Sequence, residues 1–379
     1  MKNKITYLDN NATTPVDGRV VDIVNVYFNE LFGNASSLYS FGNKSKIAVE
    51  NAKARIAELL DIEADSIYFT SGATESVNLA LKGLALNPNN SKKHIITCST
   101  EHKAVIETCD YLQTLGFEIE YLPVDNKGAI DIEHLRSSIK EDTLLVCLMW
   151  VNNETGVIHP INEVGKITKD AGIYFVCDGS QGIGKLPISL TDCSIDILCF
   201  SGHKLYATKG VGGIYIDPKI TRQNKIQPLI HGGGQESNLR SGTYNVPLIA
   251  GLGKAIEIAQ VEMQENKAHI EKLKDLLEFE LSQITGAIVN GQLSSRIYNT
   301  VNFCIPGFDT EIFIGINNDL AVSNGSACNS ALIQPSHVLL AMGLSNNNAM
   351  NSLRISIGKF NTQEDIQVLI QRIKNFINV

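Results

Sequence analysis

Lys204 is the residue of this 379-residue sequence whose setting points most directly to covalent chemistry. It follows His203 just after an apolar run, 195–200, that predicts a buried strand. Burial disfavours the charged form of an amine, so it lowers the lysine pKa and lets the neutral amine form a Schiff base with a carbonyl compound. We therefore expect Lys204 to act as a nucleophile rather than as a solvated surface charge.

Asp178 supplies a second group for the same chemistry. It directly follows another apolar run, 174–177, and its carboxylate could keep a pyridinium nitrogen protonated, which makes such a ring a good electron sink. The pair of Lys204 and Asp178 therefore indicates a pyridoxal-type cofactor more strongly than either residue alone.

Ala73 and Thr74 provide a candidate phosphate site between a predicted strand and a predicted helix at 75–83. Backbone N–H groups at a helix N-terminus bind phosphate, and the Thr74 hydroxyl adds a donor, although Thr74 could also be a plain N-cap. Ser201 and His203 are available to the same phosphate. The glycines at 182–185 and 210–213 fit neither a P-loop nor a dinucleotide-binding fingerprint.

Cys328 differs from the other cysteines because it lies in a small, polar stretch, 323–330. The eight cysteines include no CxxC pair and no metal-finger spacing, so we expect neither a disulfide framework nor a metal site. Five of the others lie inside apolar runs and are interpreted as small buried hydrophobes: Cys98, Cys147, Cys177, Cys199 and Cys304.

The elements that must position these residues follow a repeating pattern. From about residue 65 to 216, short apolar runs alternate with amphipathic segments, as in βα units that build a largely parallel sheet. Ligands bind beyond the carboxyl ends of such strands, so polar residues at successive strand ends should line one cavity and favour an enzyme over a scaffold. The predicted strands are 66–70, 94–98, 144–151, 174–177 and 195–200.

The C-terminal third predicts a second, smaller domain. A long helical pattern over about 250–284 is expected to link the two domains. Strands are expected over 296–305, in the Cys328 segment and over 351–357, followed by a closing helix from 362.

Composition excludes several classes of protein. The net charge of −8 and pI near 5.5 argue against a surface that binds nucleic acid directly. No stretch approaches the length of a membrane span, and the first residues lack the apolar core of a signal peptide. We expect a cytoplasmic α/β enzyme with no membrane contact.

The ordered motifs of the chain closely resemble those of the pyridoxal-phosphate-dependent cysteine desulfurases, which belong to aminotransferase class V and fold type I. The resemblance extends to the nitrogenase-associated and housekeeping iron–sulfur desulfurases. It implies a large domain, 16–258, with a mainly parallel seven-stranded sheet, and a smaller α+β domain, 1–15 with 259–379, that carries the catalytic cysteine. The motifs lie at 7–14, 70–76, 152–156, 178–181, 201–204, 231–236, 240–243 and 325–328.

The resemblance also implies roles for individual residues. Lys204 would carry pyridoxal 5′-phosphate, His102 would stack on its ring and act in catalysis, and Asp178 would pair with its nitrogen. Thr243 would reach the phosphate of the neighbouring subunit in a homodimer. The remaining residues are Asn153 and Gln181 at the ring hydroxyl or substrate, Ala73, Thr74, Ser201 and His203 at the phosphate, and Asn10, Asn153 and Arg354 at the substrate, with Arg354 gripping its carboxylate.

The implied reaction converts L-cysteine to L-alanine and leaves a persulfide on Cys328, which passes its sulfur to an acceptor protein. Iron–sulfur assembly, tRNA thiolation, cofactor synthesis and DNA phosphorothioation are all possible destinations. The alternatives are a selenocysteine lyase or related class V lyase, an aminotransferase, and a sulfur carrier without catalysis. The base that activates Cys328 and the role of Arg240 stay open.

Overall fold

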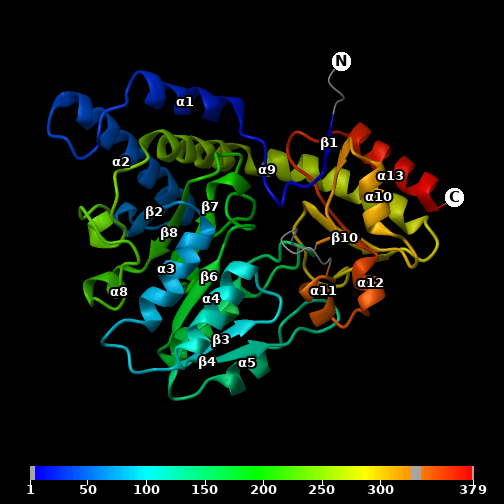
Figure 1. The fold of residues 1–379 in the computed structure, drawn as a ribbon, viewed down its shortest axis with the longest axis horizontal. Coiled ribbons are helices and arrows are strands. Elements are labelled where there is room, and N and C mark those ends of the chain that lie inside the picture. Colours follow the sequence, from blue (N-terminus) through cyan, green and yellow to red (C-terminus); the bar gives the residue numbers. More distant parts are fainter. Residues whose placement is uncertain (1–4, 326–333, 378–379) are drawn as a thin grey trace.

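The computed structural model describes residues 5–325 and 334–377 of the chain. Its centre is a seven-stranded sheet (Figure 1). β8 runs antiparallel to both of its neighbours, and the other pairings are parallel, which confirms the predicted mainly parallel sheet. In order across the sheet the strands are β2 (Ile67–Thr70), β8 (Gly212–Ile216), β7 (Ile197–Ser201), β6 (Tyr174–Asp178), β5 (Thr143–Met149), β3 (His94–Cys98) and β4 (Glu118–Leu122).

Both faces of the sheet are covered, because successive residues of its central strands enter two different cores. In β7, Ile197 and Cys199 pack with α3 and α4, whereas Leu198 and Phe200 pack with α2, α6 and α9. This burial on both sides explains why the strands are continuous apolar runs. The helices of this region are α1 (Gly18–Asn29), α2 (Ser40–Leu60), α3 (Ala73–Ala85), α4 (Lys103–Thr114), α5 (Ile132–Ser138), α6 (Ile161–Ala171), α7 (Leu190–Cys193) and α8 (Pro218–Arg222), with 3₁₀ turns at Ala64–Ser66, Gly202–Lys204 and Glu236–Asn238.

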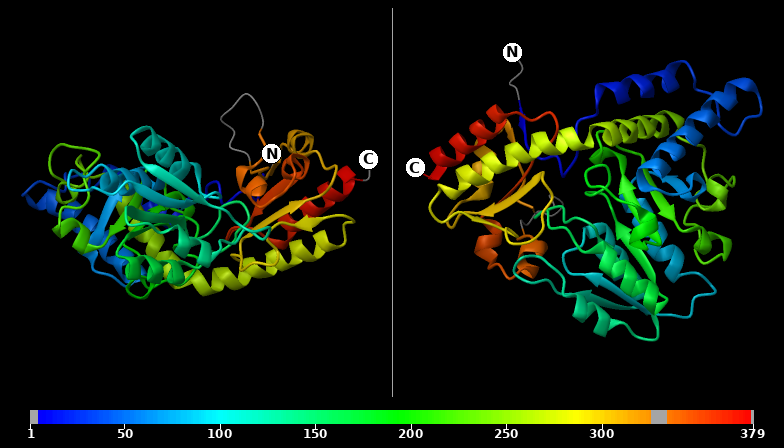
Figure 2. Two further views of the ribbon diagram at one scale, coloured as in Figure 1. Left: turned by 90° about the horizontal axis from the view of Figure 1, so that it is seen from below. Right: turned by 180° about the vertical axis from the view of Figure 1, so that it is seen from behind.

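The helix α9 (Val246–Ser282) runs from the large sheet to the smaller unit (Figures 1 and 2). It confirms the predicted linking helix. It packs on α1 and α2 at one end and on α13 and β10 at the other. The domain boundaries at 16–258 stay a prediction. The smaller unit contains β1 (Thr6–Tyr7) paired with β11 (Leu320–Ala321), the antiparallel sheet β12 (Ser352–Ser356), β10 (Thr300–Cys304) and β9 (Ile288–Val289), and the helices α10 (Thr310–Ile316), α11 (His337–Ala341), α12 (Asn346–Met350) and α13 (Gln363–Ile377).

The cysteines predicted to be apolar core residues are all buried. Of the predicted strands, the one in the Cys328 segment falls mostly within 326–333, outside the described residues. Within the described part of the chain, no helix is both long enough and apolar enough to cross a membrane.

Candidate active site

The carboxyl ends of the central strands meet at one edge of the sheet, as predicted. Asp178, the last residue of β6, lies opposite Met149 of β5 and Cys199 of β7. Ser201 ends β7, and the 3₁₀ turn that follows carries Lys204. The lysine and the carboxylate predicted from the sequence therefore come from adjacent strands.

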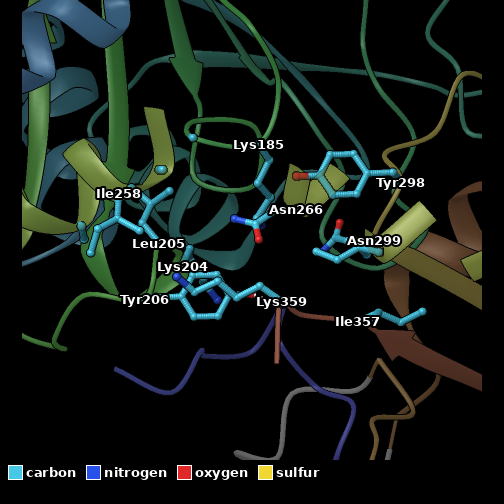
Figure 3. Close-up of a pocket in the computed structure, with 14 residues that line it drawn as sticks. Lys185, Lys204, Leu205, Tyr206, Ile258, Asn266, Tyr298, Asn299, Ile357 and Lys359 are labelled. Atoms are coloured by element: carbon cyan, nitrogen blue, oxygen red, sulfur yellow. Dashed lines mark hydrogen bonds between the residues drawn. The ribbon is translucent and has the colours of Figure 1, made fainter. Parts of the chain in front are cut away.

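The Lys204 amine points to the N-terminal segment of the chain. Nζ donates hydrogen bonds to the carbonyl oxygens of Asn11 and, at 2.8 Å, Ala12. Burial and the nearby Arg354 guanidinium lower the pKa of Lys204 to about 8. A substantial fraction of the amine is thus neutral near physiological pH, as a nucleophile requires. Figure 3 shows Lys204 among the residues that line a pocket beside this segment.

Asp178 and His102 provide the polar groups around this lysine. The buried Asp178 carboxylate accepts a hydrogen bond from the Ser180 N–H at 2.9 Å. The His102 side chain keeps contact with solvent although protein surrounds most of it, and this partial burial lowers its pKa against the opposing effect of Asp178. Its Nδ1 accepts from the Ala104 N–H at 3.1 Å, which assigns the proton of the neutral ring to Nε2.

The start of α3 is shaped to receive an anion. Its N-cap is Gly72, which offers no side chain to cap the first N–H groups of the helix, those of Ala73 and Thr74. A Cβ at Gly72 would lie 3.3 Å from the Ser201 hydroxyl, and a Cβ at Gly212 would lie 2.6 Å from the Cα of Gly72. Glycine is thus needed at both positions, where β8 approaches the start of α3. The Ser201 hydroxyl lies next to Gly72.

Arg240, whose role the sequence left open, braces this loop. Its Nε donates to Glu75 at 2.8 Å, and the other Glu75 oxygen accepts from the Ser71 N–H at 2.8 Å. His203 makes a separate contact with the N-terminal segment: its Nδ1 lies 3.1 Å from the Thr13 hydroxyl, and burial lowers its pKa to about 4. A neutral His203 can accept or donate a single hydrogen bond without adding charge.

Arg354 of β12 brings a guanidinium to the junction of the two units. Its Nη2 donates to Asp9 at 2.7 Å, and its Nη1 donates to the Asn153 carbonyl at 3.3 Å. Its buried Nε has no hydrogen-bond partner within the described residues, so donor capacity remains for a substrate carboxylate. Asn10 lies close by, but its amide nitrogen donates to the Ser356 carbonyl and to the Asn361 side chain.

Sequence reasoning missed two polar residues of this site, Asn11 and Lys185. Both bind Gln181, which was predicted: its Nε2 donates to the Asn11 carbonyl at 3.1 Å, and its side-chain oxygen accepts from the Lys185 amine at 2.9 Å. Asn11 is itself fixed by hydrogen bonds to Asn153 and Thr300. The motif at 7–14 was the available signal for Asn11, whereas the apolar neighbours of Lys185 gave none.

Two predicted residues remain, Cys328 and Thr243. Cys328 lies outside the described residues. On either side of it, Gly325 and Ser336 both approach Glu154: the Ser336 hydroxyl donates to Oε2 at 2.5 Å, and a Cβ at Gly325 would lie 2.6 Å from the same oxygen. Thr243 is exposed on the surface of the chain.

These groups fit pyridoxal phosphate. Lys204 would hold its aldehyde carbon, Asp178 its ring nitrogen, and the open start of α3 with Ser201 its phosphate, where the glycine approach leaves room. The Arg354 Nε, which has no hydrogen-bond partner in residues 5–325 and 334–377, suits the carboxylate of an amino acid. Fold and site together define a pyridoxal-phosphate enzyme of fold type I.

Comparison with known proteins narrows this class. Residues 6–369 match the family model described as aminotransferase class-V. A protein named cysteine desulfurase IscS from Rickettsia bellii is 45% identical, with 98% of this chain and 91% of that protein covered. A solved NifS-like protein covers 99% of both chains with a TM-score of 0.91 and 38% identity. The structure of SspA in complex with cysteine covers 94% of this chain and 99% of its own, with a TM-score of 0.83 and 35% identity.

The chain therefore belongs to the aminotransferase class-V family and, within it, to the cysteine desulfurases, as its motifs predicted. The family depends on pyridoxal phosphate, in agreement with the lysine, carboxylate and helix start described above.

Proposed function

We propose that the protein is a cysteine desulfurase that converts L-cysteine to L-alanine and carries the released sulfur on Cys328 to an acceptor protein. The observation that carries the proposal is that Lys204, Asp178 and Arg354 lie close together. They lie where the carboxyl ends of the central strands face the smaller unit. The names of the relatives, and the cysteine bound to SspA, favour this activity over a selenocysteine lyase or an aminotransferase.

Pyridoxal phosphate, when bound, supplies an electron sink that makes the substrate Cα–H acidic. The protein supplies the remaining groups. Arg354 binds the substrate carboxylate and fixes the orientation of the amino acid, while Asp9 and the Asn153 carbonyl keep the guanidinium in place. Lys204, with its lowered pKa, takes the proton from Cα once its amine is free.

Sulfur transfer is assigned to Cys328. Its thiolate attacks the substrate sulfur, so that a sulfur–sulfur bond forms while the carbon–sulfur bond breaks. The electron pair of the broken bond stays with the substrate Cβ, which takes up a proton to become the methyl group of alanine, and Lys204 returns a proton to Cα. The outer sulfur of the persulfide then passes to a thiol of the acceptor protein.

The remaining predicted residues complete the cofactor site in this proposal. His102 stacks on the ring, with its neutral imidazole held by the Ala104 N–H. Ala73, Thr74, Ser201 and His203 bind the phosphate, and Thr243, exposed on the single chain, reaches the phosphate of a second copy. Asn10 contacts the substrate through its amide oxygen, because its nitrogen is engaged elsewhere.

The proposal is tested by replacing Cys328 with serine. C328S is expected to retain the visible absorbance of the bound cofactor and its change on addition of L-cysteine, because these depend on Lys204 and Asp178. It should form no persulfide and should lose alanine production by at least about a hundredfold, since a hydroxyl is a far weaker nucleophile toward sulfur. Alanine and sulfide released at the wild-type rate would show that Cys328 does not accept the sulfur.

A further inference from the structure

Lys185 is a polar residue of the pocket in Figure 3 to which the proposed reaction gives no role. It lines that pocket together with Lys204 and Lys359. Burial, together with repulsion from Lys204, lowers the pKa of Lys185 to about 7. An amine in this setting costs free energy to charge, so a purely structural role would be served better by an apolar side chain.

The partners of the pocket lysines distinguish Lys185 from Lys359. Lys359 forms ion pairs with Asp17 at 2.6 Å and Glu262 at 3.3 Å, which explain its position by charge alone. Within the described residues, Lys185 has no carboxylate at ion-pair distance. Its amine instead donates to the side-chain oxygen of Gln181 at 2.9 Å.

This hydrogen bond fixes which way round the Gln181 amide lies. An ammonium group or a donating amine meets the amide oxygen, so the amide nitrogen must face the other side. There it donates to the Asn11 carbonyl at 3.1 Å, the carbonyl that also accepts from Lys204. The donor end of Gln181 therefore faces the side of the site from which Lys204 would hold the cofactor.

We propose that Lys185 is a positioning residue of the cofactor site, which orients the Gln181 amide so that its nitrogen is presented to the ring oxygen of pyridoxal phosphate. The inference rests on the proposed role of Gln181. An N–H donor stabilises the anionic form of that oxygen, so its loss makes the oxygen harder to deprotonate. Lys185 thus acts on the cofactor only through Gln181.

The test follows the visible absorbance of the bound cofactor against pH, without substrate, in wild type, K185M, Q181A and the double variant. K185M is expected to move the titration midpoint to higher pH by about 0.5 to 1 unit, the size of one lost hydrogen bond. Q181A should move it by a similar amount. The double variant should match Q181A alone, because residues that act through one contact are not additive.

K359M is the matched control, since it also removes a lysine from this pocket. It is expected to lower thermal stability, because Asp17 loses its partner, and to leave the titration midpoint where wild type has it. If K185M does not fold, K185A removes the same donor and should move the midpoint in the same direction.

Two results would overturn the inference. One is an unchanged titration midpoint in K185M or, where that variant does not fold, in K185A, while the midpoint of Q181A shifts. The other is a double variant whose shift is the sum of the two. A Q181A protein that titrates like wild type would instead refute the role of Gln181, and the inference with it. Normal titration shifts without conversion of cysteine would refute the proposed function alone.

Discussion

Basic side chains with lowered pKa values occur both at the site and away from it, and burial is the main cause in each. Burial lowers the pKa of Lys204 to about 8 beside the groups that would hold the cofactor. Burial also lowers the pKa of His159, which is 2% exposed, to about 4, and neither of its ring nitrogens has a partner within the described residues. Burial alone therefore does not mark a catalytic residue; the neighbouring groups do.

His159 should make folding stability depend on pH. Its pKa is about 4 in the folded state and near 6.5 when unfolded, so between these values the unfolded chain binds the extra proton. Stability is expected to fall as the pH drops through this window, by up to about 3 kcal/mol. The measurement is the free energy of unfolding in urea of wild type and of H159L at several pH values; the difference between the two proteins should change with pH. A constant difference between pH 7 and 4 would contradict it.

At the scale of elements, the sequence predicted most clearly the strands that are buried on both faces. β3, β5, β6 and β7 are continuous apolar runs, and all were found within a few residues. β8 was missed because it begins with Gly212 and Gly213, which have low strand propensity. The glycines at 210–213 match no nucleotide-binding motif; instead they let β8 approach Phe200 and the start of α3.

In the site, too, some features could be predicted from the sequence and others could not. Lys204, Asp178 and the α3 start could be predicted because each lies where a strand ends, which a sequence pattern reveals. The hydrogen bonds of Asn11 and Lys185 could not, because they join segments brought together only by folding.

Gly212→Ala tests the close approach of β8 and α3. An added methyl group would come within 2.6 Å of the Gly72 Cα and 2.5 Å of the Phe200 carbonyl oxygen, so the helix start must move. We expect the affinity for pyridoxal phosphate to fall at least about tenfold, or ~1.4 kcal/mol, as measured by cofactor titration of the apoprotein. G315A is the control, because a methyl group there meets no atom within 4 Å. Equal affinities of the two variants would refute the close approach.

At the scale of the whole molecule, Thr243 is exposed on the single chain, where a second copy could contact it, as the proposed homodimer requires. In the proposed homodimer, the site that holds Lys204 of one chain receives Thr243 from the other. The exposed face that carries Thr243 would then be part of an interface between two copies.

Mixed dimers test this arrangement. T243A and K204A should each be impaired alone, K204A almost completely, because it lacks the amine that holds the cofactor. After subunit exchange, each mixed dimer should contain one intact site, formed by Lys204 of the T243A chain and Thr243 of the K204A chain. We expect activity to rise above that of either parent. No gain, with exchange verified by mass spectrometry, would mean that Thr243 serves its own chain.

Glu154 contacts the residues on both sides of the stretch that contains Cys328. Because Gly325 and Ser336 both lie against one buried oxygen of this residue, the two ends of the intervening stretch are held at a short, fixed span by the large unit. A stretch taken from another family member and joined at Gly325 and Ser336 would therefore keep both contacts with Glu154.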